Sequence, residues 1–482
     1  MGLLGILIAL GLLIWLAYRG WSILLLAPAA AILAAGLAGE PLLAHWTQTF
    51  MASAAQFVMQ FFPIFLLGAL FGKLMEDSGS VASIAKTMTE RLGHERSVLA
   101  VVLAGAIVTY GGVSLFVAFF VLAPMAHQLF RTAAIPRRLM PAAIALGTTT
   151  FTMSALPGTP AIQNAIPMPF FGTTPFAAPG LGFIAAIVMF GFGMWWLGRA
   201  ERSARAKSEG YGADVPHENA AEDLVVRERA TTASTFDPPE AIHGRVNEAG
   251  PPIALAALPL VIVVAVNLVM SLIVLPRMNA SFLAQQEWGS TSLAAVGGVW
   301  AVVTALAVAI VVLIAINYRR LPALRDSMDA GANASVLPVL SVASLVGFGS
   351  VVAALPAFGM VRDWVLGIEG GPLVSLAVAT NVLASLTGSA SGGLTIALDA
   401  LGGTYLKIAH EQGINPGLLH RVAVIGAGTL DSLPHNGAVV TLLAVCNSTH
   451  RESYLDIVMV SIVGGLLALA VVIILGTTVG YF

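Results

Sequence analysis

Long apolar runs, separated by short polar segments, extend along almost the whole chain. Many of them reach the roughly 20 residues that an α-helix needs to cross the hydrocarbon core of a bilayer. This pattern predicts an all-α polytopic membrane protein. We place its spans near residues 3–18, 21–38, 52–74, 139–172, 180–198, 253–275, 292–317, 333–356, 418–448 and 455–480.

Two further apolar stretches, 97–130 and 372–409, are too long for one crossing and have glycine-rich middles. Each is either two full spans or a re-entrant hairpin that enters and leaves on the same side. The arms on each side of the glycine-rich tip have only about 12 to 17 residues, which is short for a crossing at about 1.5 Å per residue. Arm length therefore favours the hairpin.

Two polar segments of the first half of the chain recur in the second half. Residues 110–114 (YGGVS) align with 387–391 (TGSAS), and residues 154–160 (SALPGTP) align with 431–437 (DSLPHNG). Each segment is polar, rich in glycine or proline, and embedded in an apolar run. Matched breaks of this kind are typical of transporters built from two repeats, in which broken helices meet at the middle of the membrane.

Composition supports this class, and the basic residues predict an orientation. Hydrophobic residues make up 57% of the chain and charged residues 10%, against about 25% charged residues in a soluble domain. With the N-terminus outside and both long stretches returning to their starting side, most basic residues fall in inner loops, as the positive-inside rule requires. The outer side then keeps only Arg277, Arg362, Lys407 and Arg421.

The same assignment gives two halves of opposite topology, residues 1–198 and 253–482, each with one hairpin and one broken span. Residues 199–252 join the halves. They are charged and contain few large apolar residues, which predicts a cytoplasmic linker. A regulatory or partner-docking role for this segment is the alternative.

Cys446 is the single cysteine, so a disulfide framework and a cysteine-based metal cluster are excluded.

The hairpin tips are the first candidate binding segments. In lipid, a broken helix is tolerated only where the break is buried in protein or lines a cavity. Helix N-termini at such a tip supply N–H groups and partial positive charge for an anion. The alternative is that the small residues only allow close helix packing. The candidate substrate-binding residues are Thr109, Tyr110, Gly111, Gly112 and Ser114 at the first tip, and Thr387, Gly388, Ser389, Ser391 and Gly392 at the second.

The broken spans are the second set of candidate binding segments. Pro157 and Pro160 enclose Gly158, and proline removes a backbone donor and disrupts the preceding helical turn. Unwound backbone and nearby amide side chains can then bind a solute. The candidate substrate-binding residues are Ser154, Gly158, Thr159, Gln163 and Asn164 in the first break, and Ser432 and Asn436 in the second.

Asp431 and His435 are ionisable residues in the second break. Such side chains inside a span are costly and indicate function, and histidine titrates near neutral pH. We expect this pair to couple protons; the alternative is a structural clamp for unwound backbone. Asp399 either lines the pathway or pairs with a neighbouring helix. No buried arginine or lysine is evident in the sequence that would clamp a carboxylate.

No enzyme motif is present. The chain has no HExxH zinc motif, no P-loop and no GxSxG nucleophile motif. The sequence therefore predicts a protein that is not an enzyme and that uses no cofactor, no metal and no nucleic acid.

The runs from Thr109 to Pro169 and from Thr387 to Cys446 together resemble the gluconate:proton symporter (gluconate permease) family, within the ion transporter superfamily. The resemblance implies a secondary carrier that imports a small organic acid, such as gluconate, a related sugar acid or a short hydroxy acid, by proton symport across the bacterial inner membrane. It also implies an elevator mechanism, in which the hairpins and broken spans slide against a scaffold that usually forms a homodimer.

Sodium coupling is the first alternative to proton symport. Sodium-coupled members of the superfamily typically carry Ser-Asn-Thr motifs at both hairpin tips, whereas this chain has Gly-Gly-Val-Ser and Gly-Ser-Ala-Ser. Backbone carbonyls at an unwound break can still bind sodium, so both ions remain open. A channel and an intramembrane enzyme are more remote alternatives.

Overall fold

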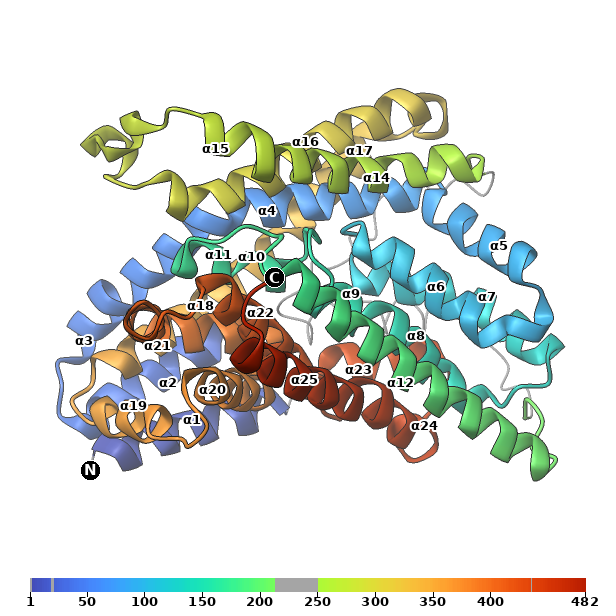
Figure 1. Ribbon diagram of the computed structural model, residues 1–482. Helices are drawn as coiled ribbons and strands as arrows, with labels where there is room; N and C mark the ends of the chain where they lie inside the picture. Colours follow the sequence, from blue (N-terminus) through green and yellow to red (C-terminus); the bar gives the residue numbers. More distant parts are fainter. Residues whose placement is uncertain (1, 19–20, 213–249, 435) are drawn as a thin grey trace.

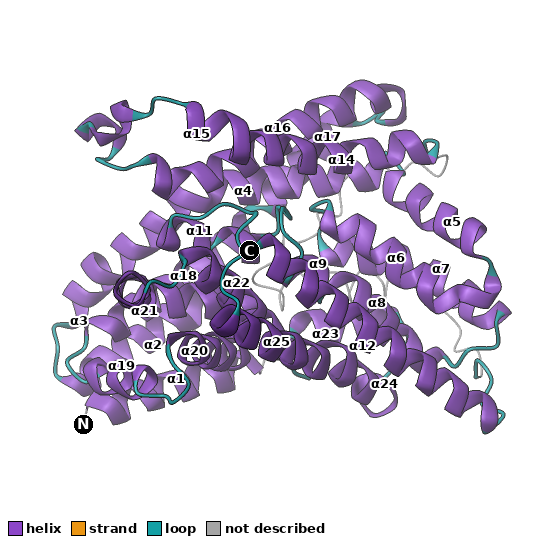
Figure 2. Cartoon of the chain, in the orientation of Figure 1, coloured by secondary structure: helices purple, strands orange, loops and turns teal. Residues whose placement is uncertain are grey.

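The computed structural model describes residues 2–18, 21–212, 250–434 and 436–482. Within these residues every regular element is a helix, and none is a β-strand (Figure 2). The all-α prediction is therefore confirmed. Seven of the described helical segments are long and apolar enough to cross a membrane. They are Leu42–Asp77, Leu115–Thr132, Pro179–Ala206, Ile253–Arg277, Leu293–Arg320, Leu324–Ala354 and His450–Thr478.

A layer of long helices forms one side of the molecule, with α14 to α17 lying over α4 in Figure 1. Most of them are apolar on every face, as expected for helices that contact lipid and other helices. α4 packs against α16, α17 and α18. The helices of this layer and its neighbours are α1 (Gly2–Tyr18), α2 (Ile23–Ala38), α3 (Leu42–Ala44), α4 (Met51–Asp77), α14 (Ile253–Val269), α15 (Leu275–Arg277), α16 (Leu293–Asn317), α17 (Leu324–Ala334) and α18 (Val336–Ala354).

The two long apolar stretches each form a pair of helices that pack against each other. The first pair is α6 (Ser97–Tyr110) and α7 (Leu115–Thr132), and the second is α20 (Pro372–Thr387) and α21 (Ala390–Gln412). α6 has 14 residues and α20 has 16, so their axes are about 21 and 24 Å long, short of the roughly 30 Å hydrocarbon core. α21 is longer than the arm that we expected, with 23 residues.

Glycine is required at the tip of the first hairpin. Gly112 has a φ angle of +97°, in the left-handed region that favours glycine. A Cβ atom at this position would lie 2.6 Å from Cγ of Pro160 in the first broken span. The tip and the break therefore touch, and no side chain fits between them.

Both predicted broken spans are interrupted. The first consists of the short helices α8 (Met140–Thr148), α9 (Phe151–Ser154), α10 (Ile162–Ala165) and α11 (Pro167–Phe171). The second consists of α22 (Pro416–Thr429), a 3₁₀ turn over Leu430–Ser432, and α23 (Gly437–Val445). The first span is also interrupted at Thr149 and Thr150, before the proline-rich segment, which we did not expect.

The remaining helices flank these elements: α5 (Ser80–Leu92), α12 (Pro179–Ala206), α19 (Phe358–Leu366), α24 (His450–Ile457) and α25 (Gly464–Thr478). α12 and α25, which follow the two broken spans, lie side by side (Figure 1). α12 continues to Ala206, beyond the end at residue 198 that we expected.

The residues after α12 fold back onto the first half. Arg138 pairs with Glu209 (Nε to Oε1, 2.8 Å) and with Asp456 of α24 (Nη1 to Oδ2, 2.9 Å). Its hydrogen bonds and positive charge lower the pKa of the Glu209 carboxyl. The hydroxyl of Tyr211 is hydrogen-bonded to Nδ1 of His127 on α7. The first part of the segment that joins the halves is therefore anchored at the start of α8 and on α7.

Candidate substrate pockets

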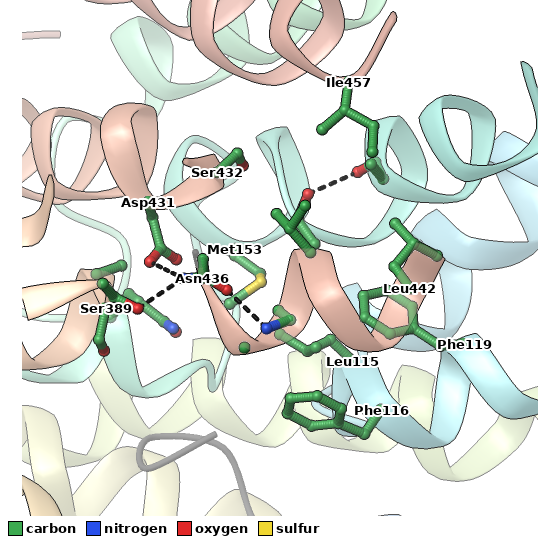
Figure 3. A pocket seen from close by; sticks show the side chains of 18 residues that line it. Leu115, Phe116, Phe119, Met153, Ser389, Asp431, Ser432, Asn436, Leu442 and Ile457 are labelled. Carbon is green, nitrogen blue, oxygen red and sulfur yellow. Dashed lines mark hydrogen bonds between the residues drawn. The ribbon is translucent and has the colours of Figure 1, made fainter. Parts of the chain in front are cut away.

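Pocket A lies where the tip of the second hairpin meets both broken spans, and it is partly open to solvent. Figure 3 shows its two ends: Asp431, Asn436 and Ser389 gather at one, and Phe116, Phe119 and Leu442 at the other. The pocket thus combines a polar end with an apolar end. Its lining residues are Leu115, Phe116, Phe119, Ala145, Thr149, Met153, Gln163, Gly388, Ser389, Ala390, Asp431, Ser432, Asn436, Gly437, Ala438, Val439, Leu442 and Ile457.

Asn436 ties the second hairpin tip to the second break. Its amide Nδ2 donates to Oδ1 of Asp431 and to the backbone carbonyl of Gly388, both at 2.7 Å. Its Oδ1 accepts from the backbone N–H of Ala438, also at 2.7 Å. One side chain therefore fixes the Asp431 carboxylate, the glycine of the tip and the start of α23.

The N-termini of three helices reach pocket A. α7, α21 and α23 begin at Leu115, Ala390 and Gly437, and all three residues line the pocket. Their N-cap side chains, those of Ser114, Ser389 and Asn436, each accept from one backbone N–H. A helix N-terminus has several N–H groups without an intrahelical partner and carries partial positive charge. The pocket therefore favours an anion.

Pocket B lies beside pocket A, at the tip of the first hairpin, and it is also partly open to solvent. Residues of α4 close one side of it. Leu115, Met153 and Gln163 line both pockets. The lining residues of pocket B are Ile64, Phe65, Gly68, Thr109, Gly112, Val113, Ser114, Leu115, Met153, Pro160, Ala161, Ile162 and Gln163.

Gln163 is the polar side chain that both pockets share. It is 4% exposed, and within the described residues its side-chain amide makes no hydrogen bond. Its amide atoms are not fully buried, so they reach the space inside the pockets. Water or a bound solute in the pockets can supply the missing partners, which marks Gln163 as a binding group.

Nine of the predicted site residues line these pockets. They are Thr109, Gly112, Ser114 and Gln163 from the first half, and Gly388, Ser389, Asp431, Ser432 and Asn436 from the second. The two hairpin tips and the two breaks, which are far apart in the sequence, therefore come together in space. His435 lies outside the described residues.

The other predicted residues line neither pocket, and Tyr110 and Asn164 make hydrogen bonds at the first break. The hydroxyl of Tyr110 donates to the carbonyl of Pro157 (2.8 Å). A Cβ atom on Gly111 would lie 2.2 Å from Leu260 of α14, so this glycine is a packing contact. The predicted residues that line neither pocket are Tyr110, Gly111, Ser154, Gly158, Thr159, Asn164, Thr387, Ser391 and Gly392.

Arg421 corrects two expectations from the sequence. The sequence places it on the outer side and shows no buried basic residue, but Arg421 is 0% exposed, one and a half turns into α22. Its guanidinium donates to the carbonyls of Ala177 (2.7 Å from Nη2) and Ser154 (3.2 Å from Nη1). It therefore inserts from the second half into the first break and binds carbonyls that the interrupted helix leaves free.

Asn164 completes this network. Its Nδ2 donates to the carbonyls of Thr159 and Pro175, both at 3.0 Å, so its Oδ1 is the acceptor for Nε2 of His420 (3.1 Å). Nδ1 of His420 then accepts from the hydroxyl of Thr173 (2.7 Å). A neutral imidazole with its proton on Nε2 satisfies both of these partners.

Asp399 lies outside both pockets. Its carboxylate accepts a hydrogen bond from the hydroxyl of Ser350 on α18. Of the two expectations for this residue, the structure shows the pairing with a neighbouring helix.

Comparison with known proteins identifies the family. The chain is 41% identical to the transporter YxjC of Bacillus subtilis (strain 168) over 99% of both chains. The model of the GntP family permeases matches residues 1–198. This protein belongs to the GntP (gluconate permease) family. It is therefore a multi-pass membrane transporter, as the resemblance implied. A segment covering 21% of this permease is 38% identical to the high-affinity gluconate transporter of Escherichia coli (strain K12), of which it covers 23%.

Two solved transporter structures share the fold of this permease. MtrF of Neisseria gonorrhoeae, one of a class of antimetabolite efflux pumps, superposes with a TM-score of 0.53 and 13% identity, over 89% of this chain and 84% of MtrF. The YdaH transporter of Alcanivorax borkumensis gives a TM-score of 0.52 and 15% identity, over 91% of this chain and 90% of YdaH. At these identities the likeness concerns the fold alone.

Proposed function

We propose that this permease is a proton symporter that imports a small organic acid, a gluconate-like sugar acid or a short hydroxycarboxylate, across the bacterial inner membrane. The observation that carries the proposal is the position of Asp431, a carboxylate beside the N-termini of α21 and α23 in pocket A. The similarity to a gluconate transporter supports an acid as the substrate.

The substrate carboxylate binds at the polar end of pocket A. Backbone N–H groups of α21 and α23 and the hydroxyls of Ser389 and Ser432 surround this end. Helix N-termini and hydroxyl donors bind a carboxylate without a basic side chain. Arg421 adds positive charge behind the first break, and its guanidinium donates to neutral oxygens of Ala177, Ser154 and Asn164.

Proton coupling follows from two negative charges in one pocket. A bound carboxylate repels the charge of Asp431, and proton uptake by Asp431 removes that repulsion. Proton and acid therefore bind together and leave together. His435 is the proposed second member of this coupling pair.

Transport proceeds by an elevator movement of the two hairpins and two broken spans against the layer around α4. Two features support this part of the proposal. The order of a hairpin, a broken span and a closing helix occurs in both halves of the chain. The pocket walls come almost entirely from the hairpins and broken spans, and only Ile64, Phe65 and Gly68 of pocket B belong to α4. The homodimer and the outside N-terminus remain predictions.

Uptake into proteoliposomes, with pH and sodium gradients imposed independently, tests the function. We expect an inward proton gradient to drive accumulation of a hydroxy acid with no sodium present. Asp431→Asn should abolish accumulation against a gradient and leave acid exchange across the membrane. Asp399→Asn is the matched control and should accumulate like the wild type, because Asp399 lies outside both pockets. Uptake that ignores pH but needs sodium would reject proton symport in favour of sodium coupling.

A further inference from the structure

Pockets A and B are adjacent and share three lining residues. Leu115 at the start of α7, Met153 of α9 and Gln163 of α10 line both of them. The side chains of Leu115 and Met153 are apolar. The third is the amide of Gln163, which makes no hydrogen bond in the described part of the chain. These three residues lie between the pockets; we refer to this place as the neck, and Gln163 is its one polar residue.

The chemistry differs on the two sides of this neck. Pocket A contains the Asp431 carboxylate and three helix N-termini. Pocket B contains no charged side chain; its polar side chains are those of Thr109, Ser114 and Gln163. The Ser114 oxygen accepts from the N–H of Phe116, which leaves its hydroxyl hydrogen for another acceptor. Pocket A thus suits the charged end of a ligand and pocket B suits a neutral, hydroxylated end.

We propose that pockets A and B are one bipartite site, in which the acid places its carboxylate in pocket A and its hydroxylated tail in pocket B, with a hydroxyl in the neck bonded to Gln163. This inference rests on the proposed function and adds chain-length selection to it. An acid of two carbons fills pocket A alone. A polyhydroxy acid of six carbons extends through the neck, and a hydroxyl there both donates to and accepts from the Gln163 amide.

Gly68 offers a way to fill pocket B without disturbing pocket A. It lines pocket B from α4, and a Cβ atom at this position would meet no atom within 4 Å. A Cβ atom at residue 68 therefore has room, and we expect the side chain of Gly68→Val to occupy part of pocket B. Gly191→Val on α12 is the matched control, since its Cβ would also meet nothing within 4 Å and Gly191 lines neither pocket.

The experiment compares the KM for gluconate, with six carbons, and glycolate, with two, in proteoliposomes of the wild type and both variants. We expect Gly68→Val to raise the KM for gluconate at least tenfold and to leave the KM for glycolate unchanged. Gly191→Val should have the same KM values as the wild type. Gly68→Ala should show the same selectivity with a smaller shift, and it serves as the test if the valine variant does not fold.

A second variant probes the neck itself. Gln163→Leu keeps the size of the side chain and removes its hydrogen bonds. It should reduce the preference for gluconate over hexanoate at least tenfold, which a change in stability alone would not do. Equal effects on short and long acids, or no effect on either, would overturn the bipartite site. A wild type that takes up neither acid would instead reject the proposed function.

Discussion

A few polar side chains form hydrogen bonds with backbone carbonyls that the interrupted helices of this permease leave unpaired. Asn164 donates from its amide to a backbone carbonyl at the first break, as Arg421 does with its guanidinium. Asn436, in the second break, donates to the Gly388 carbonyl at the second hairpin tip. Unpaired carbonyls inside a membrane protein cost several kcal/mol each. These three residues therefore allow the chain to unwind at the centre of the protein, and Gln163 and Asp431 face the space that results.

Arg421 is the residue on which we expect the first break to depend most. Replacing it with glutamine removes hydrogen bonds to Ala177 and Ser154 that no neutral side chain of that length can reproduce. We expect a loss of about 3 kcal/mol of stability and a melting temperature several degrees lower in thermal unfolding of the purified protein. Arg362→Gln, at an exposed arginine that pairs with the adjacent Asp363, is the control and should melt like the wild type. An unchanged melting temperature for Arg421→Gln would contradict the bracing role.

At the scale of helices, the hairpins pack closely on their neighbours through small residues. A Cβ atom on Gly393 of α21 would lie 2.2 Å from the backbone nitrogen of Ala384 on α20. Gly349 of α18 lies against Ile396 of α21, with 3.6 Å between an added Cβ and Cβ of Ile396. α21 therefore packs on both its hairpin partner and a helix that the elevator proposal assigns to the scaffold.

A cysteine pair at Gly349 and Ile396, in a Cys446→Ala background, tests whether α21 moves against α18. The 3.6 Å Cβ separation lies in the range for a disulfide, about 3.5–4.5 Å. We expect oxidation to stop uptake and reduction to restore it. A pair at Gly402 and Phe170, also 3.6 Å apart, joins α21 to α11 within the proposed moving group and should leave uptake intact when oxidised. Uptake that continues with the first pair locked would contradict the elevator movement.

The sequence predicted the helices and both proline-rich or glycine-rich breaks, because long apolar runs and helix-breaking residues act locally. It missed the interruption at Thr149 and Thr150, since threonine carries no breaking signal of its own. It also placed Arg421 at the surface, because a basic residue near a helix start is usually interfacial. Its burial depends on carbonyls of residues 154 and 177, which are brought to it only by the fold. The pairing of pockets A and B likewise depends on tertiary contacts.

At the scale of the whole molecule, segments from both halves of the chain meet at one place. Gln163 of the first broken span, Ser389 of the second hairpin and Asn436 of the second broken span line the same pocket, although they are far apart in the sequence. The layer around α4 closes the adjoining pocket through Gly68. A carrier needs such an arrangement, because the binding groups must reach the solute from both of its moving repeats.

The position of a bound acid tests this account most directly. An electron cryo-microscopy structure of the wild-type permease with the acid it transports should show the carboxylate between Ser389 and Asn436, and the chain of the acid beside Gln163. Density for the acid at any other place, with pockets A and B filled only by water, would contradict the account.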